Sequence, residues 1–298
     1  MASPRATQRQ EPAEAWRIMR WRSRHWAHRE QLAEGVALTM LRIPAGNFEM
    51  GAPETEAESL GRERPVHRVT LGEFLLAQTP ITQAQWRAVT QWQRLAHEDG
   101  EIWPESLDPD PVAKLVNPER FQGEQRPVVN VSWHDAMAFC QRLRLRTGKN
   151  YTLPSEAHWE YACRAGTTTP FHWGTTISAE LANYNGKVVY GEGEKGEYRQ
   201  QTMDVASFPA NPWGLHDMHG NIWEWCADYW HDNYKGGPED GCAWIDQEAK
   251  EDELKSRLLR GGSWLSSPRD CRSAYRSNIH PGLRNFYIGF RVCCLPQD

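Results

Sequence analysis

Residues 214–225 read GLHDMHGNIWEW, and the glycine and tryptophan of this stretch recur through the whole chain. The 298 residues include 23 Gly, 19 Pro, 15 Trp, 9 Tyr and 8 Phe. The mean hydropathy is −0.74, which is low for a compact domain. Large aromatic side chains compensate because each buries a large apolar area. We therefore expect a core of aromatic residues held in irregular backbone with many turns.

Three helices have sequence signals for their ends. One is predicted from the N-cap Ser132 to Gly148, and a second from Ser155 to Gly166. A weaker third helix is expected to begin near Thr82.

Two long stretches lack helical or strand periodicity. Residues 92–125 are rich in acidic residues and proline and are expected to form a surface insertion. Residues 167–217 are expected to be loop.

Residues 1–36 are predicted to form a basic, Trp-rich helical segment before a domain at residues 37–298. The helix is expected over residues 12–34, with Pro12 in its first turn and Gly35 at its end. A basic aromatic helix suits binding to membranes or nucleic acid. We favour docking on its own domain or contact with an effector protein, because the aromatic residues do not fall on one stripe.

Charge and cysteine content exclude several classes of protein. The net charge of −5 gives no global attraction for nucleic acid. No apolar run is long enough to span a membrane, and the polar N-terminus shows no secretion signal. The seven Cys include no CxxC pair, which favours reduced thiols in a cytoplasmic protein.

Several motifs follow one another in a characteristic order. They are LRIPAGNFEMG at 41–51, Pro80-Ile81-Thr82, PVVNVSW at 127–133, LPSEAHWEYACRAG at 153–166, GLHDMHGNIWEW at 214–225, RGGSW at 260–264 and IGFR at 288–291. This series resembles the formylglycine-generating enzyme and sulfatase-modifying-factor family over residues 37–298. The resemblance implies an α+β, C-type lectin-like fold with a small twisted antiparallel sheet, two main helices and much irregular loop.

The resemblance also implies an enzyme chemistry that this chain lacks in part. Enzymes of the family oxidise a substrate cysteine with two cysteines that hold copper, and soft thiolates suit Cu(I). Aligned on the RGGSW motif, the second of these corresponds to Cys271, whereas Ser266 replaces the first. A hydroxyl is a poor Cu(I) ligand, so we expect no copper and no catalytic residue beyond a vestigial Cys271. A copper-dependent formylglycine-generating oxygenase is the alternative. An iron-dependent branch needs a fused helical domain, and His25 and His28 are better explained as surface residues.

Residues 265–287 resemble the variable region of diversity-generating retroelement proteins. In such systems adenines in a template are randomised, and altering Asn codons in this way cannot produce Lys, Glu, Gln, Met or Trp. None of the candidate variable positions carries one of these five types. The candidates are Leu265, Ser266, Ser267, Arg269, Asp270, Tyr275, Ser277, Asn278, Ile279, His280, Gly282, Leu283, Asn285, Phe286 and Tyr287. The residues between them that we interpret as scaffold are Pro268, Cys271, Arg272, Arg276, Pro281 and Arg284.

The composition of this segment indicates a binding surface independently of the resemblance. Aromatic and aliphatic residues stand among Ser, Asn and Gly between two motifs typical of buried strands. Rigid aromatic side chains give contact area at low entropic cost, while small polar residues adapt to a ligand. We therefore expect residues 265–287 to bind a protein or peptide, although some side chains, Tyr275 first among them, could complete the core instead.

The resemblance further implies structural calcium sites, because all-oxygen ligands suit this hard cation. The first would use Asp217, Gly220, Ile222 and Glu224, with Asp217 in place of the usual Asn. The second, weaker site would use Asn183 and Tyr184, with Glu197 as its acidic partner. The alternative is that the carboxylates only cap local turns.

Overall fold

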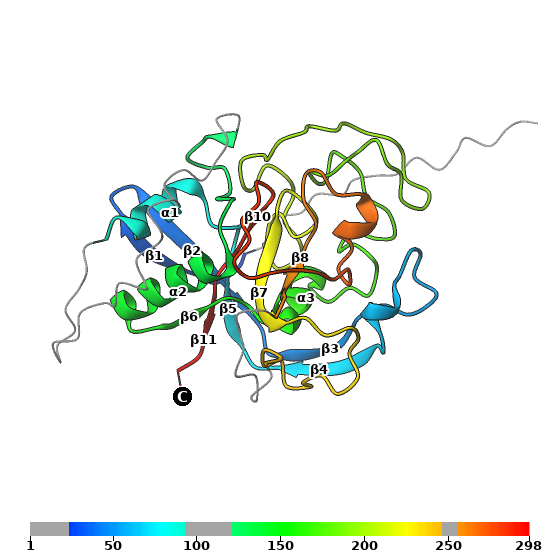
Figure 1. The fold of residues 1–298 in the computed structure, drawn as a ribbon, viewed down its shortest axis with the longest axis horizontal. Helices are drawn as coiled ribbons and strands as arrows, with labels where there is room; N and C mark the ends of the chain where they lie inside the picture. The colour runs from blue at the N-terminus through cyan, green and yellow to red at the C-terminus, as the bar shows by residue number, and fades with distance from the viewer. Residues whose placement is uncertain (1–23, 93–120, 246–254, 298) are drawn as a thin grey trace, which may run out of the picture.

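The computed structural model describes residues 24–92, 121–245 and 255–297, and every structural statement concerns these residues. The chain has the α+β, C-type lectin-like fold expected from the sequence, with small sheets, few helices and long irregular loops (Figure 1). Within the described residues no helix is long and apolar enough to cross a bilayer.

A five-stranded antiparallel sheet forms one half of the molecule. Its strands, in spatial order, are β1 (Ala27–Ala33), β2 (Val36–Ile43), β5 (Phe74–Ala77), β11 (Cys293–Leu295) and β6 (Asn150–Thr152). Helices α1 (Gln83–Thr90) and α2 (Trp133–Thr147) share a buried apolar cluster with this sheet, to which Met40, Phe139 and Phe290 contribute. Large aromatic side chains therefore fill this core, as the composition predicts.

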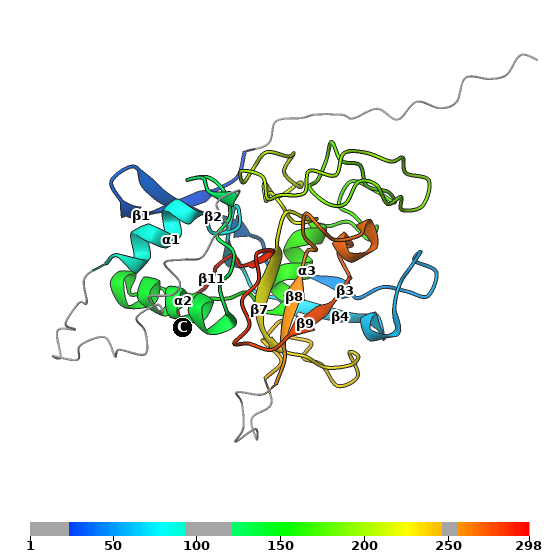
Figure 2. The same ribbon diagram turned by 45° about the horizontal axis from the view of Figure 1, so that its top comes forward.

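A four-stranded sheet forms the second half and leads to the candidate binding segment (Figures 1 and 2). Its strands, in spatial order, are β10 (Ile288–Gly289), β7 (Trp223–Tyr229), β8 (Arg257–Arg260) and β9 (Ser277–Ile279). β10 runs parallel to β7, and the other pairs are antiparallel. Helix α3 (Glu156–Arg164) contacts β7 and β8. It also contacts β3 (Gly46–Met50), which pairs with β4 (His67–Leu71) in a separate two-stranded sheet.

The three expected helices are confirmed together with their caps. The Ser132 hydroxyl accepts from the Asp135 backbone N–H, and the Asp135 carboxylate accepts from the Ser132 backbone N–H at 2.8 Å. Gly148, with φ of 67°, is the C-cap of α2. Thr82 caps α1 in the same way. Helix α3 begins after Ser155 and ends at Arg164, with Ala165 as its C-cap, one residue before the predicted stop at Gly166. Local side-chain hydrogen bonds thus fixed the starts of all three.

The stretch between α3 and β7 contains no helix or strand, as expected for residues 167–217. Buried side chains hold it in place. The Asn211 amide donates to the Ala162 carbonyl at 2.7 Å and its oxygen accepts from the backbone N–H groups of Trp213 and Leu215 at 3.0 and 3.1 Å. Such bonds replace the regular ladders that an irregular backbone lacks.

The two edge strands of the five-stranded sheet are joined by a polar cluster. Glu30 on β1 accepts from the Lys149 ammonium at 2.5 Å and from the Tyr151 hydroxyl at 3.1 Å. Tyr151 lies on β6, at the opposite edge of the strand order. The sheet must therefore curl so that both edges approach each other around α2.

The predicted N-terminal helix is wrong over its second half. Residues 27–33 form β1, which pairs with β2, and Gly35 makes the hairpin turn with φ of 72°. Side-chain exposure alternates along β1 and buries Leu32, so packing on the sheet overrides the local helical composition. The domain thus begins before residue 37, and residues 12–23 lie outside the described part of the chain.

The proposed surface insertion at 92–125 also needs correction at its end. Residues 93–120 lie outside the described chain. Phe121 is fully buried and belongs to the interior of the domain, whereas Gln122, Glu124 and Gln125 are exposed as expected for a surface segment.

Candidate functional site

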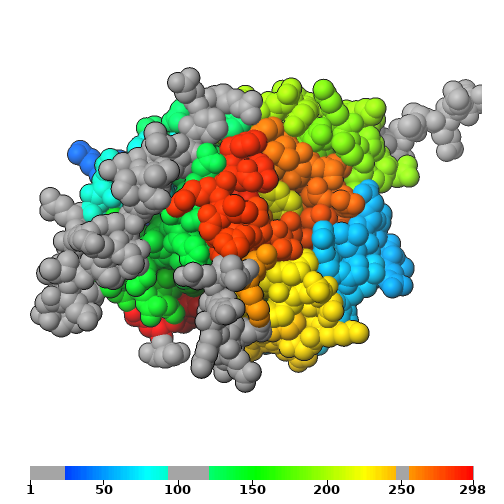
Figure 3. All heavy atoms as spheres, in the orientation of Figure 1, coloured from blue at the N-terminus to red at the C-terminus, as the bar shows by residue number. Residues whose placement is uncertain are grey.

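The segment 265–287 connects β8 to β10 and crosses the surface in the centre of the face shown in Figure 3. It contains a short 3-10 helix at Pro268–Cys271 and the edge strand β9. Both flanking motifs, RGGSW and IGFR, are buried, as expected from the sequence.

Burial separates the candidate variable positions from the scaffold positions. All but two of the candidate variable residues are partly or fully exposed, and Leu283 reaches 49%. The scaffold residues, except for Arg284, are buried. A partition chosen from the sequence therefore coincides with the division between surface and interior.

The two exceptions are Ser266 and Tyr275, for which a surface position is wrong. Ser266 is 4% exposed, and its hydroxyl accepts from the Ser263 backbone N–H at 3.0 Å. Tyr275 is 7% exposed and lies 5.9 Å from the Trp223 ring, so it completes the core. The exposed scaffold residue Arg284 donates two hydrogen bonds to Asp135 at the start of α2, at 2.8 and 3.0 Å.

Buried arginines of the segment 265–287 attach it to the interior of the domain. Arg272 donates to both carboxylate oxygens of Glu63 at 2.7 and 2.9 Å and to Glu56 at 2.6 Å. Arg276 makes a bidentate pair with Glu156 at 2.6 and 2.8 Å. Bidentate guanidinium–carboxylate pairs fix orientation as well as position. The segment is thus held by side chains that point away from its exposed face.

The same network continues into helix α3. Arg260 on β8 donates to Glu156 at 2.9 Å and to Glu160 at 2.5 Å, and Arg164 also pairs with Glu160. Burial raises the pKa of the Glu160 carboxyl, but Arg164 and Arg260 outweigh it and the net shift is downward. The sequence interpretation missed these pairs. The spacing of Glu156, Glu160 and Arg164 by four residues, on one face of a helix, was the signal that could have indicated them.

The position of Cys271 does not resemble a metal-binding thiolate pair. The thiol is fully buried, and burial raises its pKa well above the ordinary value, so the thiol stays protonated. Its Sγ lies 3.7 Å from the Ser267 carbonyl, and a Cβ on Gly262 would come within 2.5 Å of it. All seven cysteines are free, and Cys293 and Cys294 lie on β11 in the other sheet.

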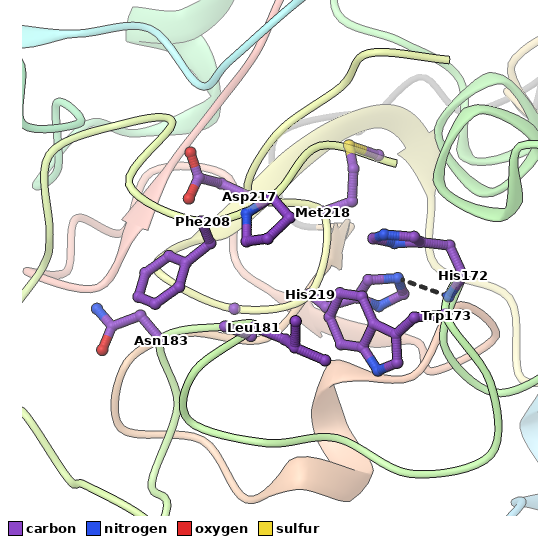
Figure 4. A pocket seen from close by; sticks show the side chains of 11 residues that line it. His172, Trp173, Leu181, Asn183, Phe208, Asp217, Met218 and His219 are labelled. Atoms are coloured by element: carbon purple, nitrogen blue, oxygen red, sulfur yellow. Dashed lines mark hydrogen bonds between the residues drawn. The ribbon is translucent and has the colours of Figure 1, made fainter. Parts of the chain in front are cut away.

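A small cavity with room for about one water molecule lies beneath the 214–225 motif (Figure 4). Asp217, Gly220 and Asn183 line one side of it, which brings residues of both predicted calcium sites to one place. Asp217 Oδ1 and Asn183 Oδ1 are buried without a hydrogen-bond partner among the described residues. Figure 4 shows Phe208 between these two side chains, so each orphaned acceptor fits an ordered water or a cation singly.

The two acidic residues of the first predicted calcium site, Asp217 and Glu224, differ in how free their carboxylates are to bind a cation. Asp217 Oδ2 accepts from the Ala206 N–H at 2.9 Å, and burial raises the Asp217 pKa to about 6 with a smaller contribution from nearby Glu224. Glu224 already accepts from Arg291 at 2.6 and 2.8 Å and from Trp159 at 2.8 Å.

The remaining ligands of these sites are backbone carbonyls and one acid. The Gly220 carbonyl accepts from the Ile222 N–H at 3.0 Å. The Tyr184 carbonyl accepts from Gly186 at 2.9 Å. Glu197 is 65% exposed and pairs with Arg199, so its side chain does not turn toward the buried Asn183. The role predicted for Glu197 is thus not supported by its position. No cluster of three His, Cys, Asp or Glu that could hold a metal occurs in the described ranges.

His172, Trp173 and His219 close the other side of the cavity (Figure 4). His219 Nδ1 donates to the Cys271 carbonyl at 2.8 Å, and its Nε2 accepts from the His172 N–H at 3.2 Å. Burial lowers the His219 pKa to about 4, so the ring is neutral and suited to donate at one nitrogen and accept at the other. This ring ties the cavity wall to the candidate binding segment.

Residues 28–294 match the model of the sulfatase-modifying factor enzyme 1-like domain family. The chain belongs to this family. Among curated relatives, the formylglycine-generating enzyme of Mycobacterium tuberculosis is 29% identical over 86% of this chain and 98% of its own length. The serine/threonine-protein kinase pkn1 of Chlamydia pneumoniae is 29% identical over 88% of this chain, which spans 39% of that relative's length.

Two solved structures of high similarity extend the comparison within the sulfatase-modifying factor enzyme 1-like fold. PvdO from Pseudomonas aeruginosa matches with a TM-score of 0.71 and 32% identity, over 90% of this chain and 97% of that one. Treponema denticola variable protein 1 matches with a TM-score of 0.66 and 26% identity, over 91% of this chain and 99% of that one. The domain is therefore similar both to named enzymes and to a named variable protein.

Proposed function

We propose that this protein is a non-catalytic member of the family that binds a protein or peptide through the exposed residues of the segment 265–287. We further propose that a retroelement diversifies this surface. The observation that carries the proposal is the coincidence of candidate variable positions with exposed side chains and of scaffold positions with buried ones. A surface can tolerate many side chains only when its backbone is held by other residues, and Arg272 and Arg276 hold it here.

The similarity to Treponema denticola variable protein 1 supports this proposal, since the likeness covers nearly the whole of both chains. The burial of Cys271 and the presence of Ser266 at the aligned position argue against the copper chemistry of the enzymes. A thiol with a raised pKa is a poor source of the thiolate that Cu(I) requires.

We also propose that calcium braces the loop around the 214–225 motif. The orphaned oxygens of Asp217 and Asn183 are its candidate side-chain ligands, and Gly220 lines the same cavity. Glu224 and the Ile222 carbonyl, which the family resemblance implies as further ligands, do not line that cavity. Contact of residues 12–34 with an effector protein also stays a proposal that rests on the sequence. The Trp26 side chain, which is 58% exposed, is accessible for such a contact.

Comparison of sister genomes tests the diversification. Substitutions should concentrate at the exposed candidate positions, with Ser266 and Tyr275 changing less than the rest because they are buried. Equally exposed residues elsewhere, such as Val66 and Ile245, serve as controls for exposure alone. Substitutions spread evenly between the two groups would refute the proposal.

A direct assay tests the catalytic alternative. The full chain is incubated with Cu(I), oxygen and a peptide containing CxPxR, and cysteine oxidation is followed by mass spectrometry. We expect no oxidation above a protein-free control. Turnover that Cys271→Ala abolishes would establish the enzyme and overturn the non-catalytic assignment.

A further inference from the structure

Four aromatic rings from separate segments contact one another beside the candidate variable face. Trp264, Phe286 and Phe121 contact each other pairwise, with 5.7 Å between the Phe121 and Trp264 centroids, and Tyr198 joins them at Trp264. The ring centroids lie 6.3 Å apart for Tyr198 and Trp264, 6.0 Å for Trp264 and Phe286, and 6.1 Å for Phe286 and Phe121. The planes of these pairs differ by only 23–33°. We call Tyr198, Trp264, Phe121 and Phe286 the aromatic strip.

Two rings of the strip are buried and the other two are partly exposed. Trp264 is 5% exposed and Phe121 is fully buried, whereas Tyr198 and Phe286 are partly exposed. Phe286 is a candidate variable residue, but Tyr198 lies outside the variable segment. The apolar surface therefore extends from the diversified residues onto a part of the chain that diversification does not reach.

The loop that carries Tyr198 is attached to the variable segment. The Asn185 N–H donates to the Ser266 carbonyl at 3.0 Å, and the Gly196 N–H closes the loop on the Gly186 carbonyl at 2.7 Å. Gly186 has no room for a side chain, since a Cβ there would lie 2.4 Å from the Glu197 carbonyl oxygen. The loop is thus fixed relative to the variable face.

The same loop exposes two adjacent aliphatic side chains. Val188 and Val189 are 41% and 37% exposed, and the Val188 N–H donates to the Asn185 carbonyl at 3.1 Å in the attached turn. Adjacent exposed apolar side chains, on a loop that is hydrogen-bonded to the candidate variable segment, are candidates for contact with a partner. Rigid aromatic rings on a fixed loop are the residues that contribute most to such contacts.

We propose, on the basis of the function proposed above, that Tyr198 with Val188 and Val189 forms the constant half of the ligand site, which receives a large apolar side chain of a peptide segment. The variable residues around Phe286 form the other half. Diversification then changes which peptide is preferred, while the constant half supplies affinity common to all ligands. Tyr198 and Phe286 are partly exposed, and Val188 and Val189 are 41% and 37% exposed. Apolar side chains of this kind suit a large apolar residue of a peptide better than the hydroxyl-rich surface of a sugar.

A phage-displayed library of random 12-residue peptides, selected on the full chain, provides the probe. The dissociation constants of selected synthetic peptides are then measured for wild type, Tyr198→Ala, Tyr198→Phe and Phe286→Ala. Lys195→Ala, an exposed change in the same loop, is the matched control. We expect selected peptides to share a large apolar residue and to bind Tyr198→Ala about tenfold or more weakly. Tyr198→Phe and Lys195→Ala should stay within about threefold, because the ring or the whole strip is kept.

A second selection on Phe286→Ser separates the two halves of the site. We expect new peptide sequences that still lose affinity on Tyr198→Ala. Peptides that depend on Phe286 or Leu283 but not on Tyr198 would overturn the constant half and leave the proposed function standing. A library without binders, or binders indifferent to both halves, counts against both proposals. Binding to a glycan array that requires Tyr198 would overturn the assignment to peptides.

Discussion

Replacing Arg272 by methionine should destabilise the fold far more than replacing Arg269, three residues earlier in the same segment. Arg272 is fully buried and donates four hydrogen bonds, to Glu63, Glu56 and the Glu58 carbonyl. Removing it leaves Glu63, which is also fully buried, without its cation. Loss of one partner of a buried ion pair costs about 3–5 kcal/mol. Arg269 is 40% exposed, pairs with Asp270 and lies 5.8 Å from the Tyr275 ring centroid, so the loss of this exposed pair costs about 0–1 kcal/mol.

The assay is urea unfolding at pH 7 followed by tryptophan fluorescence, with thermal unfolding as a second measure. We expect the melting temperature of Arg272→Met to fall by roughly 6–20 °C and that of Arg269→Met by less than about 4 °C. Adding Glu63→Gln to Arg272→Met should recover part of the loss, since the stranded charge is then removed. Equal losses for the two single variants would refute the claim that buried arginines hold the variable segment.

Three further outcomes follow from the described residues. Burial raises the Asp217 pKa to about 6 from its ordinary 3.8, so without calcium the free energy of unfolding should fall as pH rises from about 4 through about 6. In urea titrations Asp217→Asn should flatten this pH profile, whereas Asp204→Asn, at an exposed position, should not; equal slopes for the two variants would contradict the assignment. Millimolar calcium at pH 7 should raise the melting temperature of wild type but not of Asp217→Ala, and an equal rise in both would exclude a calcium site there. Leu283→Ser, at a 49% exposed position, should change the free energy of unfolding by less than about 0.5 kcal/mol in urea titrations, whereas a loss above about 2 kcal/mol would show that the variable face supports the fold.

Local signals explain which parts of the fold could be predicted. The capping residues Thr82, Ser132 and Ser155 fixed the helix starts through hydrogen bonds within four residues of the chain. The helix expected over 12–34 failed at β1, because strand formation there depends on pairing with β2 and on burial of Leu32 against distant residues. Neither the pairing with β2 nor the burial of Leu32 can be predicted from the local composition of residues 12–34.

The sequence by itself determined the family motifs and the aromatic core, and it suggested which positions of residues 265–287 are exposed and which are buried, with Ser266, Tyr275 and Arg284 as exceptions. These features depend only on the types of residue and on their order along the chain. Only the tertiary structure decided that Ser266 and Tyr275 face inward, that Glu63 and Glu156 hold Arg272 and Arg276, and that the Tyr198 ring lies 6.3 Å from Trp264. The physical reason is distance along the chain: Arg272 and Glu63 are 209 residues apart, so their pairing exists only once the chain has folded.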